Sequence, residues 1–357
     1  MRRGLMAWDP DEIPRDALRG RLDRLQTEMR LARQDAMILY TNFIRSGAVS
    51  HLTAFSPYWA DGVLLVPQDG EPTFATTLSK RVGTWIQSVK PVGELVNSPT
   101  PAAVLGKKLA ASAAKRVAIV ELDSFPAGLY DELAAALSGV EIVDGSETYA
   151  AARSHLDDVE RKLLKQADAI AKAALEQVAS APADVGAAVA AVERHTRLHG
   201  AEEAYVAIAP DLNADRRFVR LSGTKPLGQR FAIRATVAYK GAWVRRAKTY
   251  AQNEKGRTAI ARADAWLSAF IARINVDRPL GEQIVRALAE LPGSRLTGWM
   301  AEAASGSRPL AVVASQDQPN ASLSNVPALI VTIMLDLSGV PWCGAGLASL
   351  VHGSAAS

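Results

Sequence analysis

The sequence of 357 residues contains one cysteine, Cys343, and only 6% aromatic residues. One cysteine excludes an internal disulfide, and a chain without disulfides is typical of a reducing compartment. Cys343 has no basic neighbour in sequence that would activate it, so we expect a buried, unreactive thiol. No apolar run approaches the roughly 20 residues that cross a bilayer, and the start of the chain lacks the apolar core of a signal peptide. We therefore expect a cytoplasmic protein without a membrane partner.

Carboxylates are missing from one long stretch of the chain, residues 216–248. The same stretch holds ten basic residues: Arg216, Arg217, Arg220, Lys225, Arg230, Arg234, Lys240, Arg245, Arg246 and Lys248. Over the whole chain, 41 basic and 37 acidic residues give a net charge of only +4, too small to indicate a nucleic-acid-binding surface across the molecule. We expect no nucleic-acid partner and a local cationic region instead.

The first part of the chain has the pattern of an α/β layer structure. Leucines at helical spacing predict an amphipathic helix over residues 15–33. Apolar runs at 62–66 and 73–77 flank Pro67-Gln-Asp-Gly70, a turn sequence, and so predict a β-hairpin. Strands that alternate with helical segments are typical of α/β proteins.

Near residue 155 the pattern changes to long alanine-rich helices. One of them is predicted over 183–199 and ends at Gly200, a residue suited to a helix C-terminus. Further helices are predicted at 258–274 and 280–291, and strands near 310–314 and 329–335. A chain of this length supports two substantial cores, so we predict domains at 1–154 and 155–357.

Two consecutive motifs lie within the basic stretch. They read Gly228-Gln-Arg-Phe-Ala-Ile-Arg234 and Tyr239-Lys-Gly-Ala-Trp243-Val-Arg245-Arg-Ala-Lys248-Thr249. Together they resemble a segment of the creatinase/Xaa-Pro aminopeptidase (prolidase) family, which reads roughly Gly-Asp-x-Val-x-x-Asp and Tyr-x-Gly-Tyr-x-x-Asp-x-Thr-Arg-Thr. The last aspartate of the first family motif and the aspartate of the second bind metal ions. Arg234 and Arg245 stand at their places with the same spacing.

The resemblance extends over nearly the whole chain. The hairpin Gly62 to Gly70 matches a family hairpin, and the helical segment 159–168, leading to Gly200-Ala-Glu-Glu203, is similar to the entry into the family's catalytic domain. The fold that the resemblance implies is α/β (α+β), with a small N-terminal creatinase-like domain followed by a pita-bread domain.

A dinuclear metallopeptidase of this family needs carboxylate and histidine ligands around its cations. Besides Arg234 and Arg245, the resemblance puts Arg295-Leu-Thr-Gly298 at the histidine turn and Met334 at the first glutamate. A guanidinium has no lone pair to donate and stays protonated. We therefore expect no metal at the family position and no other cofactor.

Some members, the creatinases, work without a metal and use a histidine base. Arg217, next to Arg216, occupies the place of that histidine, so their mechanism does not carry over. A second family histidine corresponds to Glu302. The resemblance thus leaves Glu302 as the general base in the inferred cleft.

The arginines have two interpretations. In the first, they converge on a carboxylate, phosphate or sulfate and bind it with bidentate geometry; the candidates are Arg216, Arg217, Arg234, Arg245 and Arg295. In the second, several of them point to solvent on alternate strand faces and pair with surface carboxylates. Strand alternation prevents Arg245 and Arg246 from facing the same side.

The resemblance also implies pairing of subunits. Arg45 lies in a loop region that, in creatinase-like dimers, reaches over a neighbour's active site, and by analogy it would clamp a substrate carboxylate. The alternative is that aromatic residues of this loop region pack at an interface. We expect a homodimer or a heteromer with a related chain.

Two functions remain open from the sequence. The first is a metal-independent hydrolase or lyase acting on a small anionic, amide-like molecule, with the arginines stabilising an oxyanion and Glu302 transferring a proton. The second is a catalytically inactive pseudo-peptidase that binds a peptide or metabolite or serves as a scaffold subunit. An enzyme requires a pocket in which Glu302 and at least two arginines converge, whereas a scaffold does not.

Overall fold

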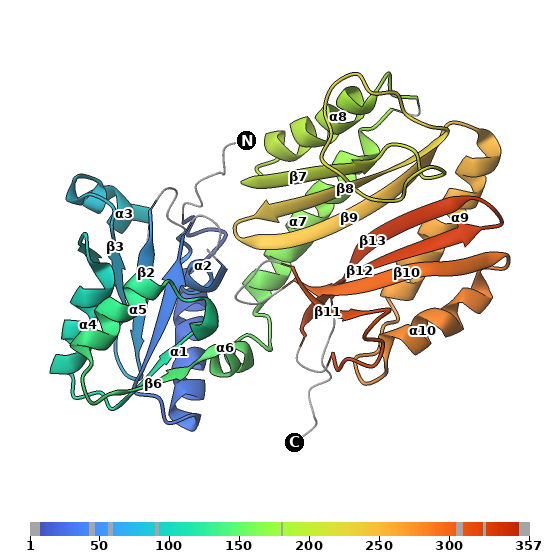
Figure 1. Ribbon diagram of the computed structural model, residues 1–357. Helices are drawn as coiled ribbons and strands as arrows, with labels where there is room; N and C mark the ends of the chain where they lie inside the picture. Colours follow the sequence, from blue (N-terminus) through green and yellow to red (C-terminus); the bar gives the residue numbers. More distant parts are fainter. Residues whose placement is uncertain are drawn as a thin grey trace. The chain divides into compact units, whose positions relative to one another are not determined.

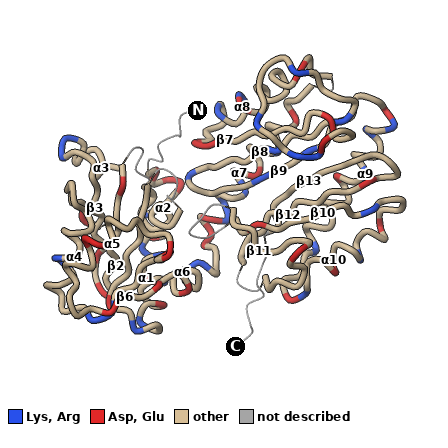
Figure 2. Tube along the Cα trace, in the orientation of Figure 1, with Lys and Arg blue, Asp and Glu red and all other residues tan. Residues whose placement is uncertain are grey.

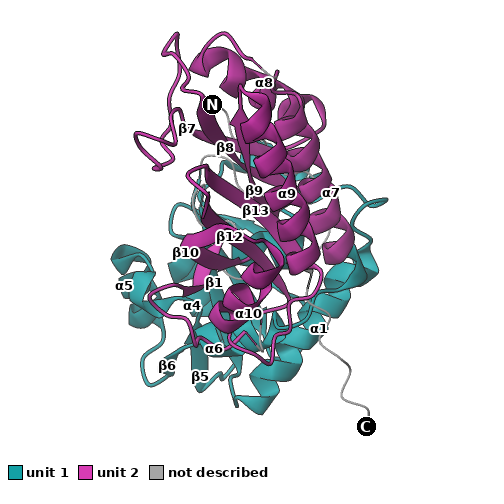
Figure 3. Cartoon of the chain, turned by 90° about the vertical axis from the view of Figure 1, so that its right-hand side faces the viewer, with its two compact units in different colours: residues 1–159, 306–308 teal, residues 160–305, 309–357 magenta. Residues whose placement is uncertain are grey.

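The computed structural model describes residues 8–42, 47–55, 60–89, 93–179, 181–304, 310–323 and 326–349 (Figure 1). The chain forms two compact units, residues 1–159 with 306–308 and residues 160–305 with 309–357 (Figure 3). The division falls in the first turn of helix α7 (Asp158–Glu176). Among the described residues, no helix is both long and apolar enough to span a membrane.

The first unit is built on a mixed six-stranded sheet in the order β4-β3-β2-β1-β5-β6. Its elements are α1 (Arg15–Leu31), β1 (Ala36–Thr41), α2 (Gly47–Thr53), β2 (Gly62–Pro67), β3 (Thr73–Thr76), α3 (Gly83–Val89), β4 (Glu94–Asn97), α4 (Pro101–Ala111), β5 (Arg116–Ile119), α5 (Ala127–Ala136), β6 (Glu141–Asp144) and α6 (Ser146–Ala152). β1, β2 and β3 pair antiparallel, whereas β3–β4, β1–β5 and β5–β6 are parallel.

The predicted first helix and first hairpin are both confirmed. α1 buries Leu18, Leu22 and Leu25, because leucines at this spacing lie on one helix face. β2 and β3 pair antiparallel around the turn that ends at Gly70, whose φ of 102° favours glycine. Arg21 on α1 donates to a carboxylate oxygen of Asp157 at 2.6 Å, which fixes the end of this unit against its first helix.

The second unit contains a seven-stranded antiparallel sheet in the order β11-β10-β12-β13-β9-β8-β7. Besides α7, its elements are α8 (Val185–Leu198), β7 (Glu203–Ala209), β8 (Arg230–Tyr239), β9 (Ala242–Ala251), α9 (Glu254–Ile271), α10 (Leu280–Ala287), β10 (Ser294–Ala303), β11 (Ala311–Ser315), β12 (Ala328–Leu337) and β13 (Pro341–Ser349). The predicted helices and strands of this region correspond to α8, α9, α10, β11 and β12.

Strands β10 and β13 were not among the predicted strands, and β13 contains two glycines, which weaken a strand pattern. Both glycines lie where α9 approaches the sheet closely. A Cβ atom at Gly344 would lie 2.8 Å from Leu267, and one at Gly346 would lie 2.7 Å from Ile271. The glycines therefore permit helix packing, and Figure 3 shows α7, α8 and α9 together on one side of the strands.

The seven-stranded sheet consists of two halves, β7–β9 and β10–β13, which meet where β13 lies next to β9. One pair in register, Ala345 and Ala247, joins them. Next to it, the Thr249 hydroxyl donates to the carbonyl of Cys343 at 2.8 Å and accepts from its backbone N–H at 2.9 Å. The sheet face opposite the helices is thus formed by residues from both halves.

Candidate functional site

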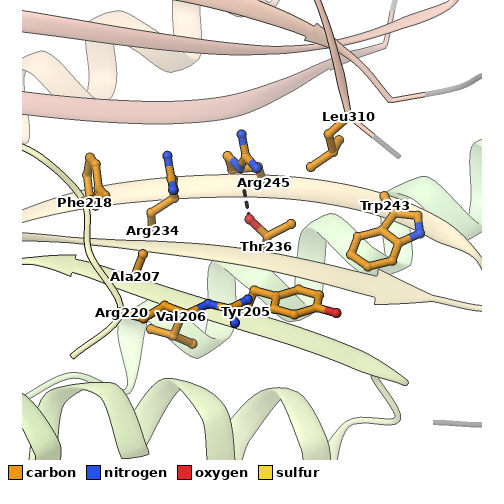
Figure 4. A pocket seen from close by; sticks show the side chains of 10 residues that line it. All are labelled: Tyr205, Val206, Ala207, Phe218, Arg220, Arg234, Thr236, Trp243, Arg245 and Leu310. Carbon is orange, nitrogen blue, oxygen red and sulfur yellow. Dashed lines mark hydrogen bonds between the residues drawn. The ribbon is translucent and has the colours of Figure 1, made fainter. Parts of the chain in front are cut away.

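A cavity of about 320 Å³ lies in the second unit, over strands β7, β8 and β9 (Figure 4). Its lining residues are Tyr205, Val206, Ala207, Phe218, Arg220, Arg234, Thr236, Trp243, Arg245 and Leu310. Pockets for small ligands have volumes of about 300–1,000 Å³, so this cavity suits a small molecule. Figure 2 marks the basic residues of β8 and β9, two of which line the cavity.

Strand register brings the lining residues together. Tyr205, Thr236 and Arg245 form one row across β7, β8 and β9, because Tyr205 pairs with Thr236 and Thr236 with Arg245. Arg234, two residues before Thr236 in β8, lies on the same face, since side chains alternate along a strand. Its own neighbours in register are the small residues Ala207 and Ala247, which leave space beside its side chain.

Arg234 is half-buried, and no carboxylate forms an ion pair with it in the part of the chain that the structure describes. Its guanidinium lies 5.1 Å from the centroid of the Phe218 ring, and it makes no ion pair or side-chain hydrogen bond to any residue that the structure describes. Burial lowers the pKa of Arg234, and the nearby charge of Arg245 lowers it further, whereas Glu302 and Cys343 act in the opposite direction. A cationic side chain in this environment favours binding of an anion.

Arg245 is held by two partners. Its Nε donates to the Thr236 hydroxyl at 3.0 Å, and its Nη1 donates to Oε1 of Glu302 in an ion pair. Glu302 is only 3% exposed, and within the described part of the chain its Oε2 has no hydrogen-bond partner. Burial raises the pKa of Glu302, although Arg245 and Arg234 both oppose this shift. Desolvation therefore outweighs the ion pair in setting this pKa.

Arg234, Arg245 and Glu302 are thus brought together, and three other predicted site residues lie elsewhere. Arg217 is 85% exposed and pairs with Asp215 at 2.8 Å. Arg216 lies 3.8 Å from a carboxylate oxygen of Asp336. Arg295 is exposed at the start of β10, and none of these three lines the cavity. Arg45 lies outside the described residues.

Arg246 faces away from the cavity, as strand alternation predicts. Its guanidinium pairs with both carboxylate oxygens of Asp168 on α7, each at 2.6 Å. The adjacent arginines of β9 therefore have different roles: Arg246 attaches a helix to one face of the sheet, and Arg245 lines the cavity on the other.

The donor groups at the family's metal positions do not fit a metal centre. Arg234 and Arg245 have no lone pairs to donate, and Met334 offers a thioether, a poor ligand for hard cations. Burial raises the pKa of the Cys343 thiol to about 12, so this buried cysteine, predicted to be unreactive, is protonated. In the described ranges, no three His, Cys, Asp or Glu side chains are grouped so that they could hold a metal ion.

Sequence analysis did not assign several of the lining residues. The Tyr205 and Trp243 rings are stacked, with centroids 6.0 Å apart and planes at 16°. The Arg220 guanidinium lies 4.6 Å from the centroid of the Tyr205 ring. Arg220 and Trp243 were visible in the basic stretch and in the second motif, but their place at a cavity depends on strand register, which the sequence does not give.

Comparisons with known proteins agree with this architecture. Residues 21–155 match the family model described as the Creatinase/Prolidase N-terminal domain. No curated protein matches the chain. Among solved structures, an Xaa-Pro dipeptidase from Bacillus anthracis has a TM-score of 0.68 at 16% identity, with 92% of this chain and 93% of that chain covered.

Two further solved structures cover the chain to the same extent. A recombinant prolidase from Thermococcus sibiricus has a TM-score of 0.66 at 13% identity and covers 93% of this chain and 94% of its own. An X-Pro aminopeptidase from Thermotoga maritima has a TM-score of 0.65 at 16% identity and covers 92% and 99%. The chain therefore has a creatinase/prolidase N-terminal domain and the prolidase fold, with a pita-bread second unit, which confirms the predicted family resemblance and fold class.

Proposed function

We propose that the second unit binds a small anionic molecule between Arg234 and Arg245 and that it does so without a metal ion. The observation that carries the proposal is the half-buried Arg234 guanidinium, which has no carboxylate partner among the described residues and lines a cavity of about 320 Å³. An anion there would supply the missing counter-charge, and two neighbouring guanidinium groups can both donate to one carboxylate or phosphate.

The geometry favours binding over catalysis. Glu302 is the one carboxylate paired with a cavity arginine among the residues described, and its side chain is almost fully buried. A general base must come within hydrogen-bond reach of the proton that it removes, whereas Oε1 of Glu302 is already bound to Arg245. The proposal is therefore a pseudo-peptidase in which a prolidase fold presents a cationic ligand site.

A metal-independent hydrolase or lyase is the second candidate. It is favoured by Oε2 of Glu302, which has no hydrogen-bond partner in the described part of the chain, and by the raised pKa of this carboxyl group. If a bound anion pairs with Arg245 in place of Glu302, the Glu302 carboxylate is released and becomes more basic. It can then accept a proton.

Metal analysis and a thermal-shift screen test the proposal. The purified chain is expected to carry far less than one equivalent of metal, and carboxylates or phosphates are expected to raise its Tm. An anion whose free concentration is 100 times its Kd raises the unfolding free energy by about 2.7 kcal/mol. Arg234→Met, which removes the charge and keeps much of the volume, should abolish the anion response.

Arg273→Met is the matched control, because Arg273 is an exposed arginine whose partner is Glu290 rather than a ligand. This variant should keep the full anion response. Stoichiometric metal, or an anion response that Arg234→Met leaves intact, would contradict the proposal. Conversion of amide-like anions by the wild-type chain, lost in Glu302→Gln, would select the hydrolase or lyase.

A further inference from the structure

The cavity has two chemically different parts. Arg234, Arg245 and the Thr236 hydroxyl form its polar part. Tyr205, Trp243 and Leu310 form an apolar part to one side of the arginines (Figure 4). A site that bound only a small inorganic anion would need the polar part alone. The aromatic part therefore indicates a ligand that has an apolar group as well as a charge.

We infer that the ligand is a carboxylate attached to a flat aromatic ring, an inference that rests on the proposed anion site. The carboxylate lies at Arg234 and Arg245, and the ring lies against Trp243. Trp243 precedes Arg245 by two residues on β9, so both face the cavity. Two residues of an antiparallel strand span about 7 Å, and the Arg245 and Trp243 side chains line the same cavity, so one small ligand can contact both.

The aromatic part provides a surface rather than a filled core. Trp243 and Tyr205 both line the cavity and are only half-buried, so part of each ring is accessible. The Tyr205 ring on β7 stacks with Trp243 across β8, with centroids 6.0 Å apart. Aromatic rings stack favourably at centroid separations of about 4.5–7 Å, and a ligand ring on Trp243 would extend this stack.

The electrostatics of the aromatic part agree with the same ligand class. Arg220 lies 4.6 Å from the centroid of Tyr205 in this part. On the other side of the arginines, Arg234 lies 5.1 Å from the centroid of Phe218 (Figure 4). Arginine guanidinium groups stack on aromatic faces. An aromatic carboxylate has both a negative charge and an aromatic face. Its carboxylate can form ion pairs with arginines, and its ring can stack on a guanidinium group.

The experiment is a calorimetric titration of the full chain with three carboxylates: benzoate, cyclohexanecarboxylate and acetate. Benzoate and cyclohexanecarboxylate share size and charge but differ in the aromatic ring. Benzoate should bind about twofold to tenfold more tightly than cyclohexanecarboxylate, the range expected for one aromatic stacking contact. Acetate should bind most weakly.

The Trp243→Leu variant provides a second measurement. It should lower benzoate affinity to that of cyclohexanecarboxylate and leave acetate binding unchanged, and its unfolding curve shows whether it folds. Equal affinity of the wild-type chain for benzoate and cyclohexanecarboxylate would overturn the inference and leave the anion site intact. Failure of all three carboxylates to bind would instead overturn the anion site, and the inference with it.

Discussion

Arg245 on β9 forms an ion pair with Glu302 on β10, although β13 and β12 separate these two strands in the sheet. The pair therefore connects the two halves of the second unit across the face that carries the cavity. It also gives one of the two central cavity arginines a direct ion-pair partner, whereas Arg234 forms no ion pair with a described residue. A bound anion and the Glu302 carboxylate would compete for the same guanidinium.

This competition predicts that Glu302→Gln strengthens anion binding. The substitution removes the negative charge and keeps the shape and an acceptor oxygen for Arg245. Both arginines then attract the ligand without competition from the Glu302 carboxylate. We expect the affinity for a small carboxylate to rise about tenfold. Calorimetric titration of the variant and the wild type measures the change.

Glu290→Gln is the matched control for this substitution. Glu290 also pairs with an arginine, Arg273, but both side chains are 52% exposed. Removing this carboxylate should not alter anion affinity. Unchanged affinity in Glu302→Gln would mean that Glu302 and the ligand do not share Arg245.

The pH dependence of stability follows from the raised pKa of Glu302. Burial makes the folded chain hold this proton more tightly than the unfolded chain, whose glutamate pKa is about 4.3. The corresponding stabilisation is complete below the unfolded pKa and is lost as pH rises through the folded pKa. We therefore expect Glu302→Gln to equal the wild type in unfolding free energy in acid and to exceed it near neutral pH.

Chemical denaturation of both proteins over a range of pH measures this difference. A constant difference in unfolding free energy across the range would contradict the raised pKa. A variant that loses stability relative to the wild type as pH rises would show that the ion pair with Arg245 outweighs the desolvation of Glu302.

Thr236 is expected to orient Arg245. Thr236→Val removes the hydroxyl that accepts from Arg245 Nε at 3.0 Å, and loss of one such hydrogen bond costs about 1 kcal/mol of unfolding free energy. Anion affinity should fall about threefold, because Arg245 becomes less ordered. Chemical denaturation measures the loss of unfolding free energy, and calorimetric titration measures the change in anion affinity.

Thr332→Val is the control for this threonine. Thr332 and Thr236 are both 7% exposed, but the Thr332 hydroxyl has no hydrogen-bond partner among the described residues. Its substitution should leave stability unchanged or raise it, because no bond is lost. Equal losses in the two variants would show that the hydrogen bond to Arg245 contributes nothing specific.

The opposite face of β9 should affect stability without affecting the ligand. Asp168→Asn weakens the bidentate pair with Arg246, in which both side chains are at most 25% exposed. We expect a loss of about 2 kcal/mol of unfolding free energy and no change in anion affinity. Altered affinity with unchanged stability would mean that the two faces of β9 are coupled in an unexpected way.

The sequence predicted several elements of both units, because helices such as α1 and the β2–β3 hairpin carry their own periodicity and turn residues. It did not predict β10 or β13. In β13, Gly344 and Gly346 weaken the strand pattern. The structural reason for these glycines is visible only where α9 packs against them. Local patterns thus located elements whose burial is periodic, whereas β13 is shaped by a neighbouring helix.

For the site, the sequence by itself determined the charge: a stretch without carboxylates, with Arg234 and Arg245 in place of the family's aspartates. Only the tertiary structure decided which arginines share a cavity. Arg234 and Arg245 do because strand register puts them on one face, whereas Arg217 pairs with a neighbour in its own loop. Charge is a property of each residue, but convergence depends on pairing between strands that are distant in sequence.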